Sequence, residues 1–398
     1  MKSGWDIKKL GEVCELIADG DWIESKDQST CGIRLVQTGN VGVGIFRHKE
    51  GSEHFVSSET FRRLNCTEIF GGDILISRLP DPVGRACVVP DLGQKMITAV
   101  DCSIVRLRRS VCLPTFLVYY ASSAEWFNAI EAKCTGSTRK RISRKNLTDV
   151  LVPIPPLAEQ NRIVAKIDAA FEKIDKLKAN AERNLANAKE LFQSALDEAM
   201  RPKDGWVEKR LGEVCKTTSG GTPIKSHREY YEDGNIPWLR SGEVCCKDII
   251  KSEMFITELG LRNSSAKIMP KNTVLIAMYG ATAAQAGILR FESATNQAIC
   301  GILPDKYFEP EFLYYYFRTI QRQLAARAQG GAQPNISQEK IKDTLVPILP
   351  LSEQREIVKN LDLLAEKIKI LEQNYTKQIA DCVEMRQAVL REAFEGRL

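Results

Sequence analysis

The sequence predicts an α+β fold: two mixed α/β domains joined by two long antiparallel coiled-coil helices, with an internal two-fold pseudo-repeat. The first observation is that residues 151–168 (LVPIPPLAEQNRIVAKID) and 345–362 (LVPILPLSEQREIVKNLD) share eleven of eighteen positions. The second is that apolar residues recur at three- and four-residue steps after each copy. A chain of 398 residues is also too long for a single core.

The repeat extends over the whole chain. GWDIKKLGEVC at Gly4 returns as GWVEKRLGEVC at Gly205, with eight of eleven residues identical. Each half therefore has one order: an opening segment, a variable stretch, an LVPI-x-PL-x-EQ motif and a helix. We predict domains at residues 1–155 and 205–349, a central helix at 156–204 and a C-terminal helix at 350–398. Because the variable stretches agree poorly, one frame carries two different inserts.

Two long helices are the clearest structural prediction. Each has about 45 residues, which gives a length of ~65 Å. A lone helix with an apolar seam is unstable in water, so the two are expected to pack against each other, and the repeat favours an antiparallel pair. The residues predicted to be structural in this spacer are Ile174, Leu177, Ile368 and Leu371.

Each variable stretch is predicted to form a mixed α/β domain. The runs IRLVQ at Ile33, DILIS at Asp73 and ACVVP at Ala86 are typical of short strands bounded by Gly, Asp and Pro. FLVYYASSAEWFNAI at Phe116 and FLYYYFRTIQRQLAA at Phe312 fit amphipathic helices. Their aromatic residues are expected in the core rather than on a ligand platform.

Composition excludes several classes of protein. No run of eighteen apolar residues and no apolar segment near the start indicates a membrane span or a secretion signal. Twelve cysteines without a CxxC pair, beside three histidines, predict neither a metal site nor a disulfide framework, and reduced thiols predict a cytoplasmic protein. There is no GxxxxGK[ST] loop for ATP. The chain is therefore predicted to be non-catalytic.

One charged segment stands out against the mild net charge of +5. Between residues 133 and 145, KCTGSTRKRISRK contains six basic residues and no acid. It is either a solvated loop or a phosphate-contacting loop in which Lys and Arg neutralise the DNA backbone. The matching segment of the second half, RAQGGAQPNISQEK at Arg327, has little charge and offers amides instead. Amides hydrogen-bond adenine edges, so the two halves are expected to grip DNA differently.

The two-copy layout, the P-L-x-E-Q turn that opens a long helix, the GW…KLGE opening and the REAFEGRL ending together resemble the specificity subunit of a type I restriction-modification enzyme. The resemblance covers essentially the whole chain, strongly in the frame and weakly in the inserts. It implies two target-recognition domains, each reading one half of a bipartite site on double-stranded DNA. It also implies that the conserved helices of that family space the domains and dock two modification subunits.

The same resemblance implies where the chemistry lies. In such complexes the modification subunit binds S-adenosylmethionine and methylates adenine, while motor-nuclease restriction subunits consume ATP and Mg²⁺. No cofactor is expected in this chain itself. The DNA target is not readable from the inserts.

DNA contacts are predicted in loops that follow strands, where variable recognition is expected on a fixed frame. The candidates in the first half are Gln37, Thr38 and Asn40, then Ser77 and Arg78, then Thr138, Arg139, Lys140 and Arg141. Their counterparts in the second half are Arg240, Ser241 and Glu243, then Met278 and Tyr279, then Gln333 and Asn335.

Two other interpretations stay open at this point: a stand-alone two-headed DNA-binding regulator and a protein-binding repeat scaffold. Salt-sensitive DNA binding is expected of a specificity subunit and of a regulator, but not of a scaffold. Copurification with a methyltransferase separates the specificity subunit from the regulator.

Overall fold

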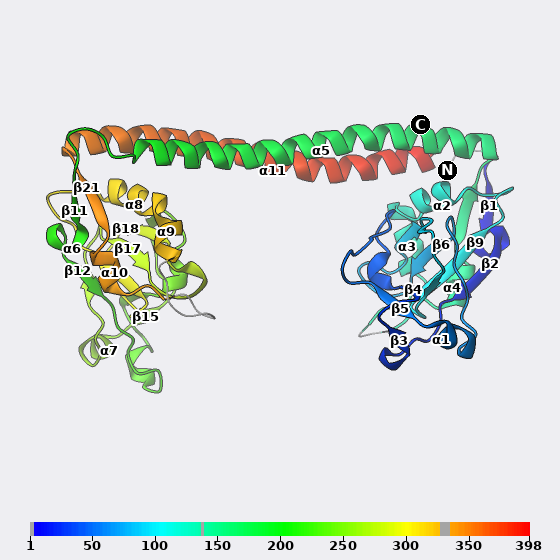
Figure 1. Ribbon diagram of the computed structural model, residues 1–398, viewed down its shortest axis with the longest axis horizontal. Coiled ribbons are helices and arrows are strands. Elements are labelled where there is room, and N and C mark those ends of the chain that lie inside the picture. The colour runs from blue at the N-terminus through cyan, green and yellow to red at the C-terminus, as the bar shows by residue number, and fades with distance from the viewer. Residues whose placement is uncertain (1–3, 137–138, 327–334) are drawn as a thin grey trace. The chain divides into compact units, whose positions relative to one another are not determined.

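The computed structural model describes residues 4–136, 139–326 and 335–398 (Figure 1). It divides into two compact units: unit 1 contains residues 1–182 and 376–398, and unit 2 contains residues 183–375. The sequence predicted that each long helix forms a segment of its own. In the structure, each compact unit contains part of both long helices. Within the described ranges, no helix is both long enough and apolar enough to cross a membrane.

Each unit is built on the same two-stranded ladder. In unit 1, β1 (Asp6–Lys9) pairs antiparallel with β10 (Leu151–Ile154). In unit 2, β11 (Val207–Arg210) pairs in the same register with β21 (Leu345–Ile348). The opening segment and the LVPI motif are therefore repeated together because they are the two strands of one ladder.

A short helical turn follows the first strand of each ladder. These turns are η1 (Leu10–Val13) and α6 (Leu211–Val214), and their leading leucines are fully buried. An ion pair closes each frame: Lys9 with Asp149 and Arg210 with Asp343, both at 2.7 Å.

Unit 1 contains two four-stranded sheets in its described part. One has the order β2 (Cys14–Asp19), β9 (Cys102–Leu107), β6 (Ile74–Ser77) and β7 (Ala86–Val88). The other has the order β3 (Gln28–Ser29), β5 (His54–Val56), β4 (Ile33–Val36) and β8 (Met96–Thr98). The short helices are η2 (Ser25–Asp27), η3 (Thr38–Asn40), α1 (Ser58–Arg63), α2 (Pro114–Tyr120), α3 (Ala124–Glu131) and α4 (Arg144–Thr148). The strands predicted from IRLVQ, DILIS and ACVVP are thereby confirmed as β4, β6 and β7.

Unit 2 repeats this plan over its described residues. Its first sheet has the order β12 (Thr217–Ser219), β20 (Ile299–Ile302), β17 (Val274–Ala277), β18 (Ala286–Leu289) and β14 (Asp248–Ile249). Its second has the order β15 (Phe255–Ile256), β13 (Ile236–Leu239), β19 (Ser293–Thr295) and β16 (Ile268–Met269). The short helices are η4 (Arg228–Tyr230), η5 (Ser241–Glu243), α7 (Glu258–Arg262), η6 (Gly280–Thr282), α8 (Pro310–Thr319), α9 (Gln321–Ala326) and α10 (Gln338–Lys342). The strands that the two units share keep one order, and unit 2 has the additional strand β14 at the edge of its first sheet.

The predicted amphipathic helices are each split in two, into α2 and α3 in unit 1 and α8 and α9 in unit 2. Ser123 caps α3 by accepting a hydrogen bond from the backbone N–H of Trp126. Phe116 and Phe312 are fully buried in the main cores of their units. The aromatic stripes are core residues, as predicted.

The two long helices, α5 (Leu157–Ala199) and α11 (Leu351–Phe394), contain 43 and 44 residues. In unit 1 the beginning of α5 shares a core with the end of α11, as seen for Ile167, Phe171, Leu390 and Phe394. In unit 2 the end of α5 shares a core with the beginning of α11, as seen for Phe192, Leu196, Ile357 and Leu361. Because start meets end in each unit, the helices run antiparallel, which confirms the predicted pairing (Figure 1).

The seam between the helices departs from the predicted heptad. Ile174 and Ile368 are buried, but Leu177 is 53% exposed and Leu371 is 38% exposed, so the packing role predicted for these two leucines is wrong. The stripe itself persists at seven-residue steps, because Ile167, Ile174, Ala181 and Ala188 are all buried. Leu177 and Leu371 each lie three residues after a buried isoleucine, on the exposed side of the helix.

A buried glutamine fixes the start of α5 to the rest of unit 1. The Gln160 side chain is fully buried, and its Oε1 accepts a hydrogen bond from the Leu113 backbone N–H at 2.8 Å. Its Nε2 donates to the carbonyl oxygens of Val111 and Pro155, both at 2.8 Å. Leu113 is the N-cap of α2, so one amide joins the start of the long helix to the start of the first core helix.

Gln354 makes the same three bonds in unit 2. Its Oε1 accepts from the Glu309 N–H at 2.9 Å, and its Nε2 donates to the carbonyls of Tyr307 (2.7 Å) and Leu349 (3.0 Å). A buried amide with all of its bonds made specifies one geometry, whereas an apolar side chain would not. The need for this buried glutamine in each unit explains why the P-L-x-E-Q turn occurs twice in the sequence.

A second tie lies at the last residue of each repeated segment. The Tyr119 hydroxyl donates to Asp168, and the Tyr315 hydroxyl donates to Asp362 at 2.5 Å. Burial, together with the neighbouring carboxylate, raises the pKa of both phenols well above the ordinary value. Both hydroxyls therefore stay protonated and remain donors to the long helices.

Candidate nucleic-acid interface

Two of the predicted loops in unit 1 are held together by a buried arginine, Arg85. Its Nε donates to the Val41 carbonyl at 2.8 Å and its Nη2 to the Thr38 carbonyl at 3.1 Å. Its Nη1 donates to three carbonyls of the loop after β6, those of Leu79 (3.0 Å), Pro80 (2.9 Å) and Pro82 (3.1 Å). Burial lowers the pKa of the Arg85 guanidinium, which nevertheless stays charged. Its rigid planar fork fixes the loop after β4 against the loop after β6.

The basic segment joins the same cluster through Arg78. The Arg78 Nε donates to the Ile142 carbonyl at 3.1 Å, and the Ile142 N–H donates to the Arg78 carbonyl at 3.4 Å. The Arg78 N–H in turn donates to the Asp101 carbonyl at 2.8 Å, and the Asp101 carboxylate pairs with Arg141 at 3.2 Å. Loops from four separate parts of the sequence therefore converge at one end of the unit 1 sheets.

The convergence buries three of the predicted DNA contacts. Asn40, Ser77 and Arg78 are exposed by only 4%, 0% and 8%. Asn40 Oδ1 accepts from the Gln37 N–H at 2.9 Å, and its Nδ2 donates to the Arg47 carbonyl at 2.8 Å. Arg78 forms an ion pair with Asp19 at 2.5 Å. These polar side chains are used inside the domain, so the structure gives them positioning roles in place of the predicted DNA contact.

The remaining candidates of the first half lie at or near the surface. Gln37 and Thr38 are half-buried, and Arg139 and Lys140 are exposed. Lys140 pairs with Glu131, whereas Arg139 has no ion pair within the described ranges. Thr138 lies outside the described residues. DNA contact by any of these residues stays a prediction.

Unit 2 anchors its counterpart loops by the same backbone bonds. The Met278 N–H donates to the Ala298 carbonyl at 2.8 Å, and the Ile336 N–H donates to the Met278 carbonyl at 2.9 Å. The Met278 side chain is only 3% exposed and packs in the core, which argues against its predicted DNA contact. Tyr279 is 37% exposed and forms an isolated β-bridge with Asn335. Gln333 lies outside the described residues.

The loop after β13 also repeats the loop after β4. Glu243 Oε1 accepts from the Arg240 N–H at 2.8 Å, the same bond that Asn40 makes in unit 1. Glu243 Oε2 accepts from the Glu253 N–H at 2.9 Å, and the exposed Arg240 pairs with the Glu253 carboxylate at 3.0 Å. The Thr282 hydroxyl donates to the Ser241 carbonyl at 3.3 Å and makes the loop-to-loop link that Arg85 makes in unit 1. Glu243 is therefore a structural cap, while Arg240 lies exposed at the surface in its ion pair with Glu253.

Unit 2 has a groove around that arginine, which we name the Arg240 groove. It consists of two hollows, of about 680 and 590 Å³, and Arg240 and Asn296 line both of them. The first is also lined by Ser241, Cys245, Cys246 and Lys251, and the second by Thr222, Lys225, Trp238 and Gln297. The groove has as many carboxylates (Glu232, Glu243, Asp248 and Glu253) as cations (Lys225, Arg228, Arg240 and Lys251), so it has no excess of positive charge. Its amides and hydroxyls are instead suited to hydrogen-bonding base edges.

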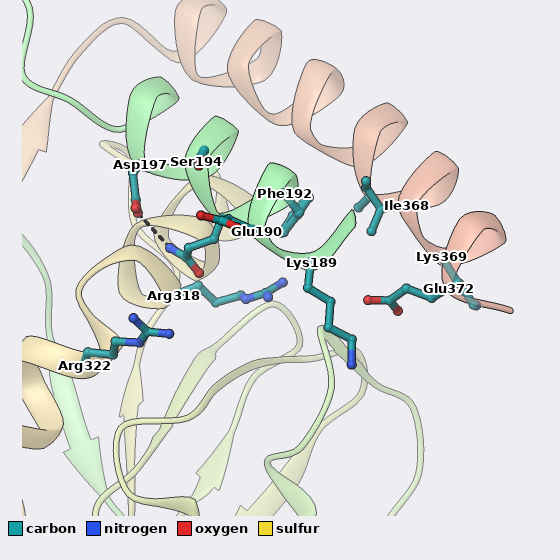
Figure 2. Close-up of a pocket in the computed structure, with 12 residues that line it drawn as sticks. Lys189, Glu190, Phe192, Ser194, Asp197, Arg318, Arg322, Ile368, Lys369 and Glu372 are labelled. Atoms are coloured by element: carbon teal, nitrogen blue, oxygen red, sulfur yellow. Dashed lines mark hydrogen bonds between the residues drawn. The ribbon is translucent and has the colours of Figure 1, made fainter. Parts of the chain in front are cut away.

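A larger hollow of about 810 Å³ lies in unit 2 where α5, α8, α9 and α11 meet (Figure 2). Its cations are Lys189, Arg318, Arg322 and Lys369, and its carboxylates are Glu190, Asp197 and Glu372. Figure 2 shows the carboxylates interspersed among the cations, and Arg318 also lies over the Phe192 ring at 5.1 Å. Alternating charge makes this hollow a poor site for a phosphate backbone, which favours clustered cations.

Two α/β units on a duplicated frame, each with converging polar loops at the strand ends, define a two-headed nucleic-acid-recognition protein. Comparison with known proteins identifies the family to which it belongs. The family model for the type I restriction modification DNA specificity domain matches residues 2–185 and 203–380. The chain therefore belongs to this family and is a type I restriction-modification specificity subunit, as its repeated motifs predicted.

Individual relatives agree with this placement. The chain is 27% identical over 308 residues to the EcoR124I/EcoR124II specificity subunit of Escherichia coli, covering 74% of this chain and 71% of that one. It is 26% identical over 317 residues to the EcoBI specificity subunit of the same species, covering 70% and 65%. It is 21% identical over 392 residues to a putative specificity subunit, MjaX, of Methanocaldococcus jannaschii, covering 92% and 88%.

Solved structures show the same fold. A chain from work on complex assembly and conformational transition of the type I R-M system matches with a TM-score of 0.81 at 23% identity, over 100% of this chain and 99% of that one. The HsdS subunit from Thermoanaerobacter tengcongensis matches with a TM-score of 0.61 at 21% identity, over 100% and 98%. At these identities the likeness concerns the fold alone.

Sequence reasoning missed two parts of the candidate interface. Arg85 stands between Gly84 and Ala86 at the start of an apolar strand, and a cation in that position was the available signal for a buried positioning residue. Asn296 and Gln297 follow β19, and the amide pair after a strand was a signal of the same kind as the one used for Gln37. Both were overlooked because their frame partners carry different residue types.

Proposed function

We propose that each unit reads one half of a bipartite sequence on double-stranded DNA, and that the long helices dock two modification subunits. The observation that carries this proposal is the duplication itself. The same ladder, buried glutamine and helix appear twice, whereas the loop residues at the strand ends differ between the copies. A fixed frame with two different loop sets is what independent reading of two half-sites requires.

The division of labour follows from the same proposal. The chain supplies recognition, an S-adenosylmethionine-dependent modification subunit supplies adenine methylation, and motor-nuclease subunits supply ATP- and Mg²⁺-dependent cleavage. The complex works in the cytoplasm, where its DNA substrate lies. The exposed apolar residues of the long helices that are not used within either unit, such as Leu177 (53% exposed) and Leu363 (53% exposed), support a docking role for these helices.

The experiment is co-expression of the full chain with the modification subunit encoded beside it, followed by affinity purification and mapping of methylated adenines in host DNA. We expect a complex containing two modification subunits per chain and one methylated bipartite sequence with a fixed unspecified gap. Sequence-specific binding without a copurifying methyltransferase would identify a stand-alone regulator instead. Absence of salt-sensitive DNA binding would leave only a protein scaffold.

A further inference from the structure

In unit 2, two chain segments that are distant in sequence are held side by side at the Arg240 groove. The Gly221 N–H donates to the Thr295 carbonyl at 2.9 Å, and the Asn296 N–H donates to the Leu239 carbonyl at 2.9 Å. A Cβ at Gly220 would lie 2.0 Å from the Thr295 carbonyl oxygen, so only glycine permits this approach. The backbone therefore fixes residues 222, 296 and 297 next to one another in the groove.

The side chains at these positions have unused hydrogen-bonding capacity. The Thr222 hydroxyl donates to Oε1 of Gln297, which is exposed. Asn296 Oδ1 accepts from the Ala298 N–H at 3.1 Å. Among the residues that the structure describes, neither Gln297 Nε2 nor Asn296 Nδ2 has an acceptor. Because each amide oxygen has a partner and each NH₂ group has none, the groove presents donors of fixed orientation.

Unit 1 places different chemistry at the same positions of the frame. The Asp21 N–H donates to the Thr98 carbonyl at 2.8 Å, and the Ala99 N–H donates to the Val36 carbonyl at 3.1 Å, which are the counterparts of the unit 2 bonds. Trp22 thereby occupies the place of Thr222, and Ala99 and Val100 occupy those of Asn296 and Gln297. Trp22 is 70% exposed, an unusual setting for the largest aromatic side chain.

We propose that these positions determine the DNA sequence that each unit prefers, an inference that rests on the proposed function and deepens it. Gln297 reads an adenine in the second half-site: its NH₂ donates to N7, and the lone pair of Oε1 that Thr222 leaves free accepts from N6. Asn296 supplies a further donor beside it in the same groove. In unit 1, Trp22 and Val100 take an apolar base edge such as the thymine methyl.

The first test measures the affinity of the purified full complex for duplexes that carry the mapped bipartite site, with each base pair of the two half-sites substituted in turn. Gln297→Ala should weaken binding about 5- to 100-fold, and the variant should no longer discriminate at one A·T pair of the second half-site. The first half-site should be read as before. Trp22→Ala should change preference only in the first half-site. Gln323→Ala, at another exposed glutamine of unit 2, is the matched control.

The outcomes separate this inference from the proposed function. Equal weakening on every duplex, or unchanged discrimination by the Gln297→Ala variant, would overturn the assignment while the complex still methylates a bipartite site. A wild-type complex that shows no preference for any bipartite duplex would overturn the proposed function itself. Circular dichroism of each variant confirms that loss of discrimination is not loss of fold.

A second, independent test uses the native cysteines. Cys245 and Cys246 line the Arg240 groove and are exposed, and Cys31 is an exposed cysteine of unit 1. A duplex that carries only the second half-site should slow iodoacetamide alkylation of Cys245 and Cys246 by at least about tenfold at saturation, and leave Cys31 unchanged. If the half-site duplex binds but protects neither cysteine, the DNA must bind elsewhere on unit 2.

Discussion

Replacing Gln160 with leucine should destabilise unit 1 far more than a surface substitution beside it. Leucine has a similar volume, so the change removes the amide without opening a large cavity. It leaves the Leu113 N–H and the carbonyls of Val111 and Pro155 without the bonds that now measure 2.8 Å. The side chain is fully buried, so water does not replace it without disturbing the core.

The magnitude follows from the number of groups left unpaired. Each unsatisfied buried group costs about 1–3 kcal/mol, and a carbonyl falls at the lower end because, with two lone pairs, it is more often left partly unbonded. Three groups give a loss of about 3–6 kcal/mol in the free energy of unfolding, a large share of the ~5–15 kcal/mol that holds a domain folded. At about 2–4 °C per kcal/mol for a unit of this size, the midpoint should fall by about 6 °C or more.

Differential scanning calorimetry of the full chain measures this change, and three variants make it specific. Asn161→Leu alters the exposed neighbour, whose amide makes only a local bond to the Leu157 carbonyl at 2.9 Å, and should shift the midpoint by less than about 2 °C. Gln354→Leu should reproduce the loss in unit 2, where the three bonds recur.

Gln160→Glu adds a dependence on pH. Its buried carboxyl would face two carbonyls, so the protonated form is favoured and the folded pKa rises above the unfolded value of about 4.3. The variant should therefore be least destabilised below about pH 4 and lose stability as pH rises. If Gln160→Leu shifted the midpoint no further than Asn161→Leu, the buried amide would not be what joins helix to domain.

Three further outcomes are expected. Arg85→Lys should abolish sequence preference in the first half-site and leave the second unchanged in methylation mapping. The reason is that an ammonium cannot bond all five carbonyls that fix the two loops. An unaltered first half-site would show that the two loops keep their positions without Arg85. Neutralising Arg139, Lys140 and Arg141 together should weaken DNA binding and reduce the salt slope by about one unit per lost phosphate contact, and an unchanged slope would remove the segment from the interface. Inserting four helical residues between positions 178 and 187 lengthens α5 by ~6 Å, or between one and two base pairs at ~3.4 Å each. The half-sites should stay the same while the gap widens, and an unaltered gap in an active complex would show that the helices do not set it.

Much of the architecture was available from local pattern. The duplicated ladder, the short strands and the two long helices follow from alternation, apolar period and Pro or Gly punctuation, which are properties of neighbouring residues. The family follows from the same frame, because the proline turn and its glutamine occur in both halves of the chain. What the pattern placed incorrectly was the second apolar position of the heptad: Leu177 fits the apolar stripe in the sequence, yet it is 53% exposed, whereas Ile174 is buried.

For the candidate interface, the sequence predicted the positions of the loops but not the role of each residue in them. The sequence located the loops, since polar residues after buried strands mark the ends of a sheet, and both halves carry them at matching places. It did not tell reading residues from positioning residues. Asn40 and Gln37 look alike in the sequence, yet Asn40 is 4% exposed with both ends of its amide bonded, and Gln37 is half-buried on the loop.

The sequence by itself determined that one frame is used twice, because ladder pairing, helix period and turn chemistry act over a few residues. Only the tertiary structure decided which polar groups are satisfied inside the protein, because that depends on backbone carbonyls brought from distant parts of the chain. Arg85 is inside because the carbonyls of Thr38 and Val41, more than forty residues away, converge on it. Gln297 is outside because its NH₂ meets no acceptor among the described residues, and hydrogen-bonding capacity left over after folding is what remains for DNA.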